Sequence, residues 1–332
     1  MTILVTGGAG YIGSHMVHAL ADAGEQVVVL DNLSSGFATA IPASIPLEVG
    51  ETGDERLLGS LLKEHSVQSI IHFAASVVVP DSVRDPLGYY RNNTSNSRTL
   101  MAAAVAAGVR HLIFSSTAAV YGNPAQVPVA EDTPTIPMSP YGASKLMTEM
   151  MLRDAAAAHG LKYVVLRYFN VAGADPQGRT GQSTPGATHL IKVAAETALG
   201  RRPHLEVYGT DYPTSDGTCI RDYIHVTDLV RAHSAALDYL RRGGANATLN
   251  CGYGQGYSVL QVIEAVKRMS GRDFCVRYAP RRPGDPTSIV AEARRIRELL
   301  GWRPALDDLD TIVDHALAWE RKLSFPAAQR SA

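Results

Sequence analysis

A tyrosine and a lysine, Tyr141 and Lys145, stand four positions apart at the start of a predicted helix, residues 141–159. Side chains at i and i+4 share one face of a helix. An ammonium about 4 Å from a phenol, at an effective dielectric constant near 20, favours the phenolate by roughly 4 kcal/mol, or about three pKa units. This predicts a Tyr141 pKa lowered from about 10 towards 7, so that the phenol can exchange a proton with a hydroxyl group. An ordinary surface pair would have the same spacing.

Hydroxyl side chains follow a predicted strand at residues 111–115. Ser115, Ser116 and Thr117 stand at its carboxyl end, and in a doubly wound sheet this end borders the bound ligand. We expect Thr117 to hydrogen-bond the reacting oxygen. The alternative is a hydroxyl that only stabilises the turn after the strand.

Three glycines, Gly7, Gly10 and Gly13, follow a predicted strand at residues 3–6, and the last of them lies in the first turn of a predicted helix at residues 11–23. Such glycines permit a tight turn, a close approach of the backbone to a pyrophosphate, and close packing of helix on strand. The helix N-terminus adds free N–H groups and a partial positive charge. Glycines that only form a turn are the alternative, but the order of strand, glycines and helix favours a dinucleotide site.

Asp31 follows a second predicted strand, residues 26–30, and stands 18 residues after Gly13. A carboxylate there accepts hydrogen bonds from both hydroxyls of an adenosine ribose and repels a 2′-phosphate. No Arg or Lys occurs between Asn32 and Gly36. The sequence therefore favours NAD over NADP as cofactor.

Strand and helix patterns alternate through the first half of the chain. Further strands are predicted at residues 45–49, 69–73 and 163–167, and further helices at residues 54–65 and 96–107. Apolar strands separated by helices indicate an α/β fold with a doubly wound parallel sheet of the Rossmann type. After residue 170 the chain becomes turn-rich, and helical patterns return at residues 188–199, 226–240, 258–269 and 309–322. We expect an NAD-binding domain at residues 1–170 and a smaller mixed substrate-binding region at residues 171–332, with residues 226–245 returning to the first part.

The composition excludes several classes of function. The chain has 332 residues, 45% of them hydrophobic, and a formal net charge of −1, so neither nucleic acid nor a membrane is an expected partner. Cys219, Cys251 and Cys275 form no CxxC pair or metal pattern, and we expect them to be reduced, with no metal bound. Residues 1–13 lack the features of a signal peptide, and no apolar run reaches about 18 residues. These features predict a cytoplasmic protein.

Several segments together resemble the UDP-glucose 4-epimerases of the extended short-chain dehydrogenase/reductase family. They are TGGAGYIG, HFAA, FSSTAAVYG, SPYGASK, LRYFNVAGA, DYPTSDGTCIRDYIHV and APRRPGD, and they span residues 6–285. The resemblance implies a tightly bound NAD that takes a hydride from C4 of a UDP-linked hexose and returns it to the other face of a 4-keto intermediate. It also implies that Tyr141 removes the 4-hydroxyl proton, that Lys145 tunes Tyr141, and that Thr117 assists.

The resemblance also assigns binding residues. Cofactor contacts fall on Gly7, Gly10, Tyr11, Ile12, Gly13, Asp31, Asn32, Glu51, Thr52, Phe73, Ala74, Ala75, Asn92, Ser115, Tyr141, Lys145 and Tyr168. Sugar-nucleotide contacts fall on Thr117, Tyr141, Asn170, His189, Leu190, Val207, Tyr208, Arg221, Arg282 and Asp285. From the residues alone, Arg221 could instead pair with Asp222, Tyr208 could belong to the core, and Arg281 and Arg282 could form a solvated pair.

This chain departs from the family pattern at four places. Glu51-Thr52 replaces an Asp-Ile pair beside the adenine, Val77 replaces a lysine, and His189 replaces an asparagine that helps to hold the UDP. Ile289 occupies the position that limits the size of the hexose, where some members have tyrosine. N-acetylated sugars therefore stay open as substrates.

Other functions remain as alternatives. The nearest are UDP-N-acetylglucosamine, UDP-arabinose and UDP-glucuronate 4-epimerases. Dehydratases of the group carry an acidic pair where this chain has Ala118 and Ala119. A simple dehydrogenase would need added cofactor for turnover. A non-catalytic NAD-sensing regulator would typically lack Tyr141 or Lys145. The resemblance also implies a homodimer that pairs the helices at residues 96–107 and 141–159.

Overall fold

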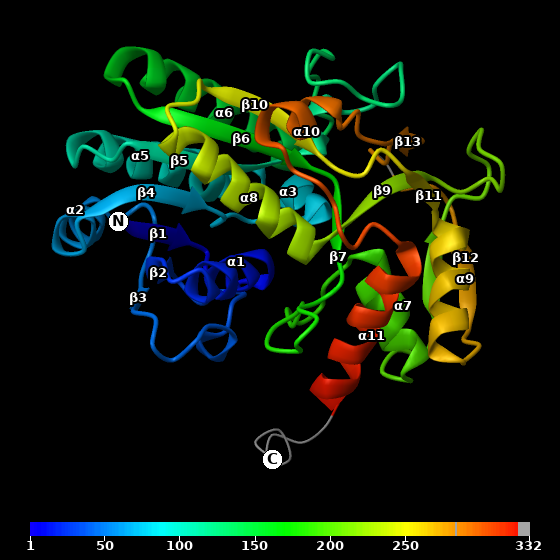
Figure 1. The fold of residues 1–332 in the computed structure, drawn as a ribbon. Coiled ribbons are helices and arrows are strands. Elements are labelled where there is room, and N and C mark those ends of the chain that lie inside the picture. The colour runs from blue at the N-terminus through cyan, green and yellow to red at the C-terminus, as the bar shows by residue number, and fades with distance from the viewer. Residues whose placement is uncertain (283, 325–332) are drawn as a thin grey trace.

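A seven-stranded sheet forms the larger part of the computed structural model, which describes residues 1–282 and 284–324. Its strands run in the order β10-β6-β5-β4-β1-β2-β3, and every neighbouring pair is parallel (Figure 1). The strands are β1 (Thr2–Thr6), β2 (Gln26–Asp31), β3 (Leu47–Val49), β4 (Val67–His72), β5 (His111–Thr117), β6 (Lys162–Tyr168) and β10 (Ala247–Cys251). The predicted fold class, a doubly wound parallel sheet, is confirmed.

Alternate residues of the central strands pack into separate apolar clusters. Ile3 and Val5 of β1 belong to one cluster, and Leu4 between them belongs to the other. Successive side chains of a strand point to opposite faces, so the two clusters are the two faces of the sheet. This explains why the strands read as continuous apolar runs.

Helices cover both faces of the sheet. On one face lie α1 (Tyr11–Asp22) and α8 (Val226–Arg241), and on the other α2 (Glu55–Glu64), α5 (Asn96–Ala106) and α6 (Pro140–His159). Local signals set their ends. The Asp54 side chain accepts hydrogen bonds from two backbone N–H groups at the start of α2, and α6 begins at a capping serine followed by Pro140.

The connection from β4 to α5 has helical structure of its own, for which the sequence analysis predicted no element. It contains α3 (Val79–Arg84), α4 (Pro86–Tyr89) and a π-helical turn, Tyr90–Ser95, that runs directly into α5. Short 3-10 turns lie at Ala38–Ala40 and Ala118–Tyr121.

The smaller part contains helices and short strands from the second half of the chain. Its helices α7 (Leu190–Ala198), α9 (Val259–Ser270) and α11 (Leu309–Ser324) pack on one another. Strand β9 (Ile220–His225) pairs with β7 (Asn170–Ala172), β11 (Gly256–Ser258) and β13 (Ser288–Ile289), and β8 (Leu205–Tyr208) pairs with β12 (Val276–Ala279). In Figure 1 these elements lie beside the large sheet, while α10 (Arg294–Leu300) packs near α8 and β10.

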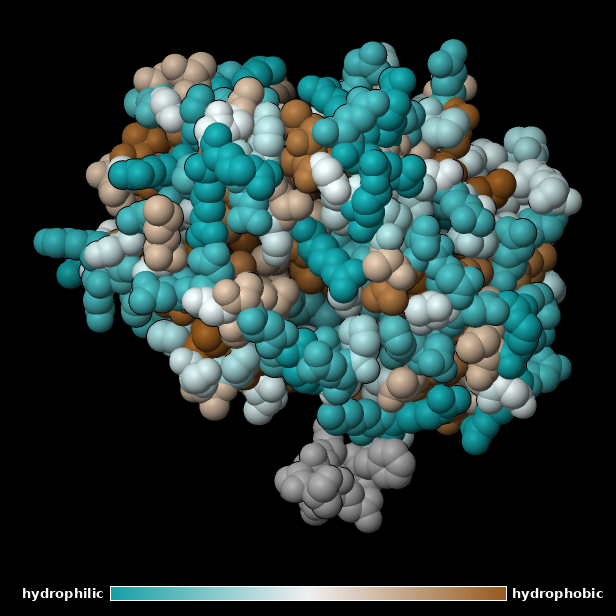
Figure 2. Space-filling model, viewed as in Figure 1, coloured by the Kyte–Doolittle hydropathy of each residue, from teal (hydrophilic) through white to brown (hydrophobic). Residues whose placement is uncertain are grey.

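The two parts share the chain in an interleaved way. After the smaller part begins, α8 returns to pack on α1, β5 and β6, and β10 becomes the edge strand beside β6. A boundary at residue 170 stays a prediction. Figure 2 shows mainly hydrophilic side chains on this face, with hydrophobic ones in small groups. Within the ranges described, no helix has both the length and the apolar composition needed to cross a membrane.

Candidate functional site

A cavity of about 600 Å³ opens at the carboxyl ends of the strands of the large sheet. Ligands of open α/β sheets bind at this edge. The cavity brings together most of the residues that the sequence singled out. They are Gly7, Gly10, Tyr11, Ile12, Gly13, Asp31, Asn32, Glu51, Thr52, Phe73, Ala74, Ala75, Asn92, Ser115, Thr117, Tyr141, Lys145, Tyr168, Asn170, His189, Arg221 and Asp285.

The glycine loop has the geometry of a phosphate site. Gly7 has a φ of 70°, and a Cβ placed on it would lie 2.6 Å from the backbone nitrogen of Ala74. A Cβ on Gly13 would lie 2.1 Å from the Gly7 carbonyl oxygen. Helix α1 begins after Gly10 without a side-chain cap, so its first N–H groups are free to bind an anion. No larger residue fits these two positions without moving the backbone.

Asp31 ends β2 at the rim of the cavity and is only 7% exposed. Its carboxylate accepts hydrogen bonds from the backbone N–H of Ala9 (2.9 Å) and of Leu33 (2.8 Å). Each oxygen of a carboxylate has two lone pairs, so both can still accept a ribose hydroxyl. Asn32, the next residue, donates to Glu51 at 3.0 Å. The residues at this end therefore fit the adenosine half of a dinucleotide.

Tyr141 lines the part of the cavity beyond the glycine loop and Asp31. It is 9% exposed, on the first turn of α6. Burial raises the pKa of its phenol to about 12, and a hydrogen bond with the Thr117 side chain works in the opposite direction. The Thr117 hydroxyl also accepts the Ala119 N–H at 3.1 Å, which fixes its position after β5. The predicted fall in the Tyr141 pKa towards 7 is wrong for these side chains, because loss of hydration outweighs every favourable contact.

Lys145 lies one turn further along α6, with its Nζ donating to the Ser115 carbonyl oxygen at 2.8 Å. It is 3% exposed, and burial lowers its pKa to about 7, while the negative charge of Glu149 works against the decrease. Its ammonium contacts the end of β5. The effect of Lys145 on the Tyr141 pKa is smaller than the effect of burial, contrary to what the spacing of the two residues suggested.

The far end of the cavity carries polar groups from several elements. Arg221 lines it and donates from Nη1 to the Ile220 carbonyl oxygen at 2.8 Å. It does not pair with Asp222, whose carboxylate accepts three backbone N–H groups, from Tyr253, Gly254 and Ala291. His189 pairs through Nδ1 with the Gln182 amide at 2.8 Å.

Four predicted sugar-nucleotide residues lie outside the lining of this cavity. Leu190 lines a separate small cavity, and Val207 is buried in the core. The guanidinium of Arg282 stacks 4.4 Å from the Tyr208 ring centre and donates to Asp285 at 3.1 Å. Arg282 is therefore held by its neighbours and not simply solvated. Through this hydrogen bond, Arg282 contacts Asp285, which lines the cavity.

Comparison with known proteins places this architecture in a family. Residues 3–252 match the model of the NAD dependent epimerase/dehydratase family. The chain belongs to this family. It is similar to the UDP-glucose 4-epimerase of Azospirillum brasilense, with 60% identity over 99% of this chain and 95% of the relative.

Solved structures of the same family have the same fold. The crystal structure of UDP-glucose 4-epimerase from Brucella ovis in complex with NAD has a TM-score of 0.93 and 44% identity, covering 96% of this chain and 97% of the other. The structure of the UDP-Glc/GlcNAc 4-epimerase from Campylobacter jejuni has a TM-score of 0.85 and 47% identity, covering 97% of this chain and 99% of the other. The resemblance found in the sequence motifs is confirmed.

Several lining residues of this epimerase-family cavity were missed by the sequence analysis. Ser76 accepts a hydrogen bond from Asn92 Nδ2 at 2.9 Å and thereby fixes one wall, and Gln182 fixes the ring of His189. Both lie in segments without regular periodicity. The only signal was the position of Ser76 shortly after β4, where ligand residues gather. The other missed residues include Ser34, Tyr89, Ser139, Thr184, Thr188 and Pro286.

Proposed function

We propose that this chain is a UDP-glucose 4-epimerase that interconverts UDP-glucose and UDP-galactose with NAD held in the cavity. The observation that carries the proposal is the meeting of the glycine loop, Asp31, Thr117, Tyr141 and Lys145 in one cavity. A site for a dinucleotide and a buried phenol beside a hydroxyl group together suit reversible oxidation of an alcohol. The similarity to curated UDP-glucose 4-epimerases over nearly the whole chain supports the same reading.

Each half of the cofactor has suitable partners. The N-terminus of α1, with Tyr11 and Ile12, suits the pyrophosphate, and Asp31 suits the adenosine ribose. Phe73, Ala74 and Ala75 offer an apolar wall on the nicotinamide side. Bound NAD supplies a positively charged ring that reversibly accepts the C4 hydrogen of the sugar with its electron pair.

Tyr141 is the proton acceptor in this proposal. Its phenolate takes the proton of the 4-hydroxyl group as the alcohol becomes a ketone, and its phenol returns that proton when the alcohol forms again. Thr117 holds the same oxygen by a hydrogen bond and shares the proton. Lys145, fixed on the Ser115 carbonyl oxygen, orients the site and adds positive charge.

The sugar nucleotide occupies the end of the cavity near the smaller part. Arg221 binds the diphosphate, and Asp285 accepts ribose hydroxyls, while Asn170 and His189 contact the sugar side. For Arg282 to bind a phosphate, it must leave the Asp285 carboxylate. Tyr208 would then offer its ring beside the uracil. Leu190 and Val207, which lie outside the lining of the cavity, stay predicted contacts of the sugar nucleotide.

A second candidate is a UDP-sugar 4-epimerase that also accepts N-acetylated sugars. Ile289 lines the cavity and leaves more room there than a tyrosine would. The Campylobacter jejuni protein, named for both glucose and N-acetylglucosamine forms, is 47% identical to this chain. Direct competition between substrates separates the two candidates.

We also propose a cytoplasmic homodimer. Met147 and Met150, two large apolar side chains on the outer face of α6, are 43% and 48% exposed. Next to the small exposed residues of α5 they form a surface that a second copy would cover. Light scattering at several protein concentrations tests this, and a purely monomeric species would refute it.

The proposed activity is tested without added cofactor. Purified protein is incubated with UDP-galactose, UDP-N-acetylgalactosamine and UDP-arabinose, the products are separated, and the denatured protein is analysed for released NAD. We expect UDP-glucose to form and NAD to be released. A Tyr141→Phe variant that keeps NAD should lose activity by about 10²–10⁴-fold. Full activity in that variant would refute the mechanism.

A further inference from the structure

One wall of the sugar-nucleotide end of the cavity is a single loop, residues 181–189. Gln182, Thr184, Ala187, Thr188 and His189 from this loop all line the cavity. The Gln182 amide donates to Nδ1 of His189, which leaves the ring proton on Nε2. Burial lowers the pKa of His189, so its ring is neutral. The position of this loop therefore sets where the Nε2–H group of His189 can donate a hydrogen bond to a ligand in the cavity.

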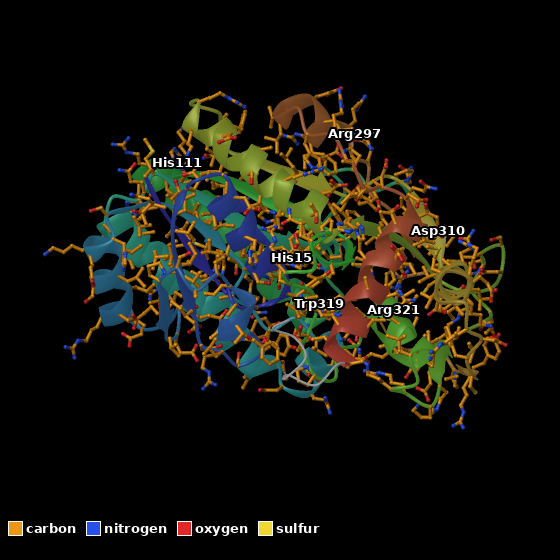
Figure 3. All side chains as sticks on the ribbon, turned by 60° about the horizontal axis from the view of Figure 1, so that its bottom comes forward. His15, His111, Arg297, Asp310, Trp319 and Arg321 are labelled. Atoms are coloured by element: carbon orange, nitrogen blue, oxygen red, sulfur yellow. The ribbon has the colours of Figure 1, made fainter. Side chains whose placement is uncertain are left out.

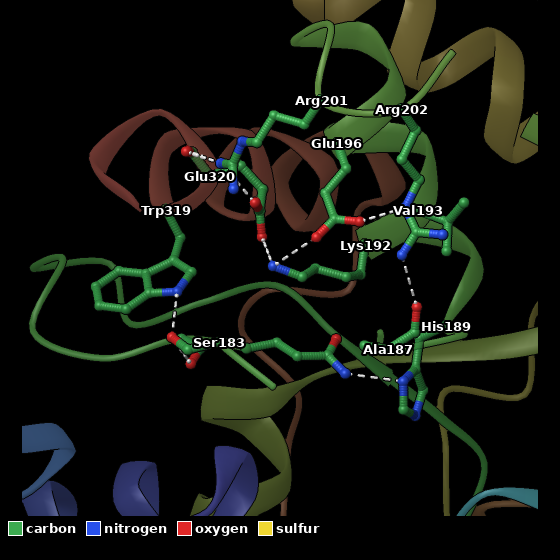
Figure 4. A network of polar contacts seen from close by, with 12 residues as sticks. Ser183, Ala187, His189, Lys192, Val193, Glu196, Arg201, Arg202, Trp319 and Glu320 are labelled. Carbon is green, nitrogen blue, oxygen red and sulfur yellow. Dashed lines mark hydrogen bonds and ion pairs between the residues drawn. The ribbon is translucent and has the colours of Figure 1, made fainter. Parts of the chain in front are cut away.

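The C-terminal helix α11 lies directly behind this loop. Trp319 donates from its indole nitrogen to the Ser183 hydroxyl at 3.2 Å (Figure 4). A Cβ on Gly181 would lie 2.4 Å from Cγ of the Trp319 ring, so the loop backbone rests on the indole. In Figure 3, Trp319 projects from α11 towards the side of α1, where His15 is labelled, and Arg321 projects the other way. The indole is thus the surface on which the loop packs.

Buried ion pairs hold α11 in that place. Lys192 of α7 pairs with Glu320 of α11, and their side chains are 5% and 2% exposed. Arg201 also pairs with Glu320, at 2.7 Å. Such pairs resist displacement, because moving one partner would leave a buried charge uncompensated.

The end of the loop is tied to the same network. Lys192 also pairs with Glu196 at 3.2 Å, and Glu196 pairs with Arg202. Arg202 then donates to the carbonyl oxygen of Ala187 at 3.2 Å (Figure 4). The space left between loop and helices has a volume of about 20 Å³, room for about one water. The loop is therefore supported at both ends and has little freedom to shift outward.

We propose that Trp319 is a positioning residue that holds residues 181–189 in the conformation that binds the sugar nucleotide. Trp319 stands 130 residues after the end of that loop in the sequence. The proposal rests on the proposed function for the identity of the ligand. Trp319 touches neither the reacting atoms nor the cofactor end of the cavity, since it is absent from the cavity lining. Its loss should weaken substrate binding and leave the chemical step and NAD retention intact.

The test compares Trp319→Ala with Trp319→Phe and Ser183→Ala. We expect Trp319→Ala to raise the KM for UDP-galactose about tenfold with kcat within about twofold. Trp319→Phe keeps an aromatic ring under Gly181 and should restore most of the affinity. Ser183→Ala removes the hydrogen bond from the indole and the one that the same hydroxyl donates to the Gly181 carbonyl oxygen, and it keeps the indole ring under the loop. Its KM should therefore rise about threefold. NAD content should equal that of the unchanged protein in all three variants.

Two control variants on the same helix separate positioning from general destabilisation. Leu317→Ala removes a fully buried side chain that is absent from the linings of both cavities, and Arg321→Ala changes an exposed one. We expect Leu317→Ala to lower the Tm without raising KM, and Arg321→Ala to change neither. An unchanged KM in Trp319→Ala, or an equal rise in Leu317→Ala, would overturn the proposal.

Calorimetric binding of UDP supplies a readout that needs no turnover. We expect the Kd for UDP to be larger for Trp319→Ala than for the unchanged protein. If the unchanged protein binds UDP but converts no UDP-sugar, the proposed function fails and the positioning role is still tested by the binding data. If Trp319→Ala does not fold, Ser183→Ala decides, and equal UDP affinity in that variant would count against the proposal.

Discussion

Replacing Lys145 by methionine separates the contribution of its charge from that of its shape. Burial places the Tyr141 pKa at about 12, so a phenolate at pH 7 requires a decrease of about five units, roughly 7 kcal/mol. An ammonium about 4 Å away supplies at most roughly 4 kcal/mol, or about three units. Lys145→Met keeps the length of the side chain and removes this contribution. Burial lowers the Lys145 pKa to about 7, so only part of the protein carries this charge at pH 7. We therefore expect kcat at pH 7 to fall, by at most about 10³-fold.

The pH dependence carries the stronger test. Lys145 has its pKa lowered by burial to about 7, so its ammonium, and the help that it gives to the phenolate, diminishes as the pH rises through that value. In Lys145→Met only the phenol titrates, and kcat should rise about tenfold per pH unit between pH 7 and 9. Tyr141→Phe should show no such rise.

The assay is single-turnover or steady-state epimerisation of UDP-galactose across that pH range, with rates divided by the NAD content of each preparation. This correction matters because Lys145 lines the cofactor cavity. A pH profile of NAD-loaded Lys145→Met that is flat, or that matches the profile of the unchanged protein, would show that the ammonium does not act on the phenol.

Three other substitutions, one of them with a matched control, test the cavity and the elements around it. Gly13→Ala places a Cβ 2.1 Å from the Gly7 carbonyl oxygen and should yield protein without NAD. The control Gly59→Ala, in α2, places a Cβ with no atom within 4 Å. It should raise the free energy of unfolding, measured in urea, by about 0.5–1 kcal/mol. Asp31→Ala leaves the Ala9 and Leu33 N–H groups unpaired; unfolding should become easier by about 1–3 kcal/mol, and the denatured protein should release little NAD. Ile289→Tyr fills part of the cavity and should lower kcat/KM for UDP-N-acetylgalactosamine at least about tenfold more than for UDP-galactose; equal losses would remove Ile289 from the control of sugar size.

The central sheet was readable in the sequence because most of its strands are continuous apolar runs. Strand β10 was missed because it carries Asn250 among its apolar residues. The Asn250 side chain is fully buried and satisfied, donating to the Val129 carbonyl oxygen and accepting from Tyr121. A polar residue whose partners lie more than 100 positions away cannot be recognised as a core residue from local pattern.

In the site, too, residues in short local motifs could be predicted, and residues placed by contacts far along the chain could not. Gly7, Gly13, Tyr141 and Lys145 form short motifs on predictable elements, and the structure brings them to one cavity. The protonation of Tyr141 was wrongly predicted, because spacing along a helix says nothing of how much water surrounds the phenol. Gln182 was missed because it lies in an irregular segment whose place depends on Trp319, far along the chain.

The edge position of β10 has a consequence for synthesis of the chain. Strand β6 ends at residue 168, but its outer neighbour is made of residues 247–251. During translation, the backbone groups along one side of β6 therefore stay unpaired until about eighty further residues have left the ribosome. An unpaired strand edge is a template for pairing with other chains. A nascent chain paused within this interval would be the species most prone to aggregate, and the natural client for a chaperone that shields exposed strands.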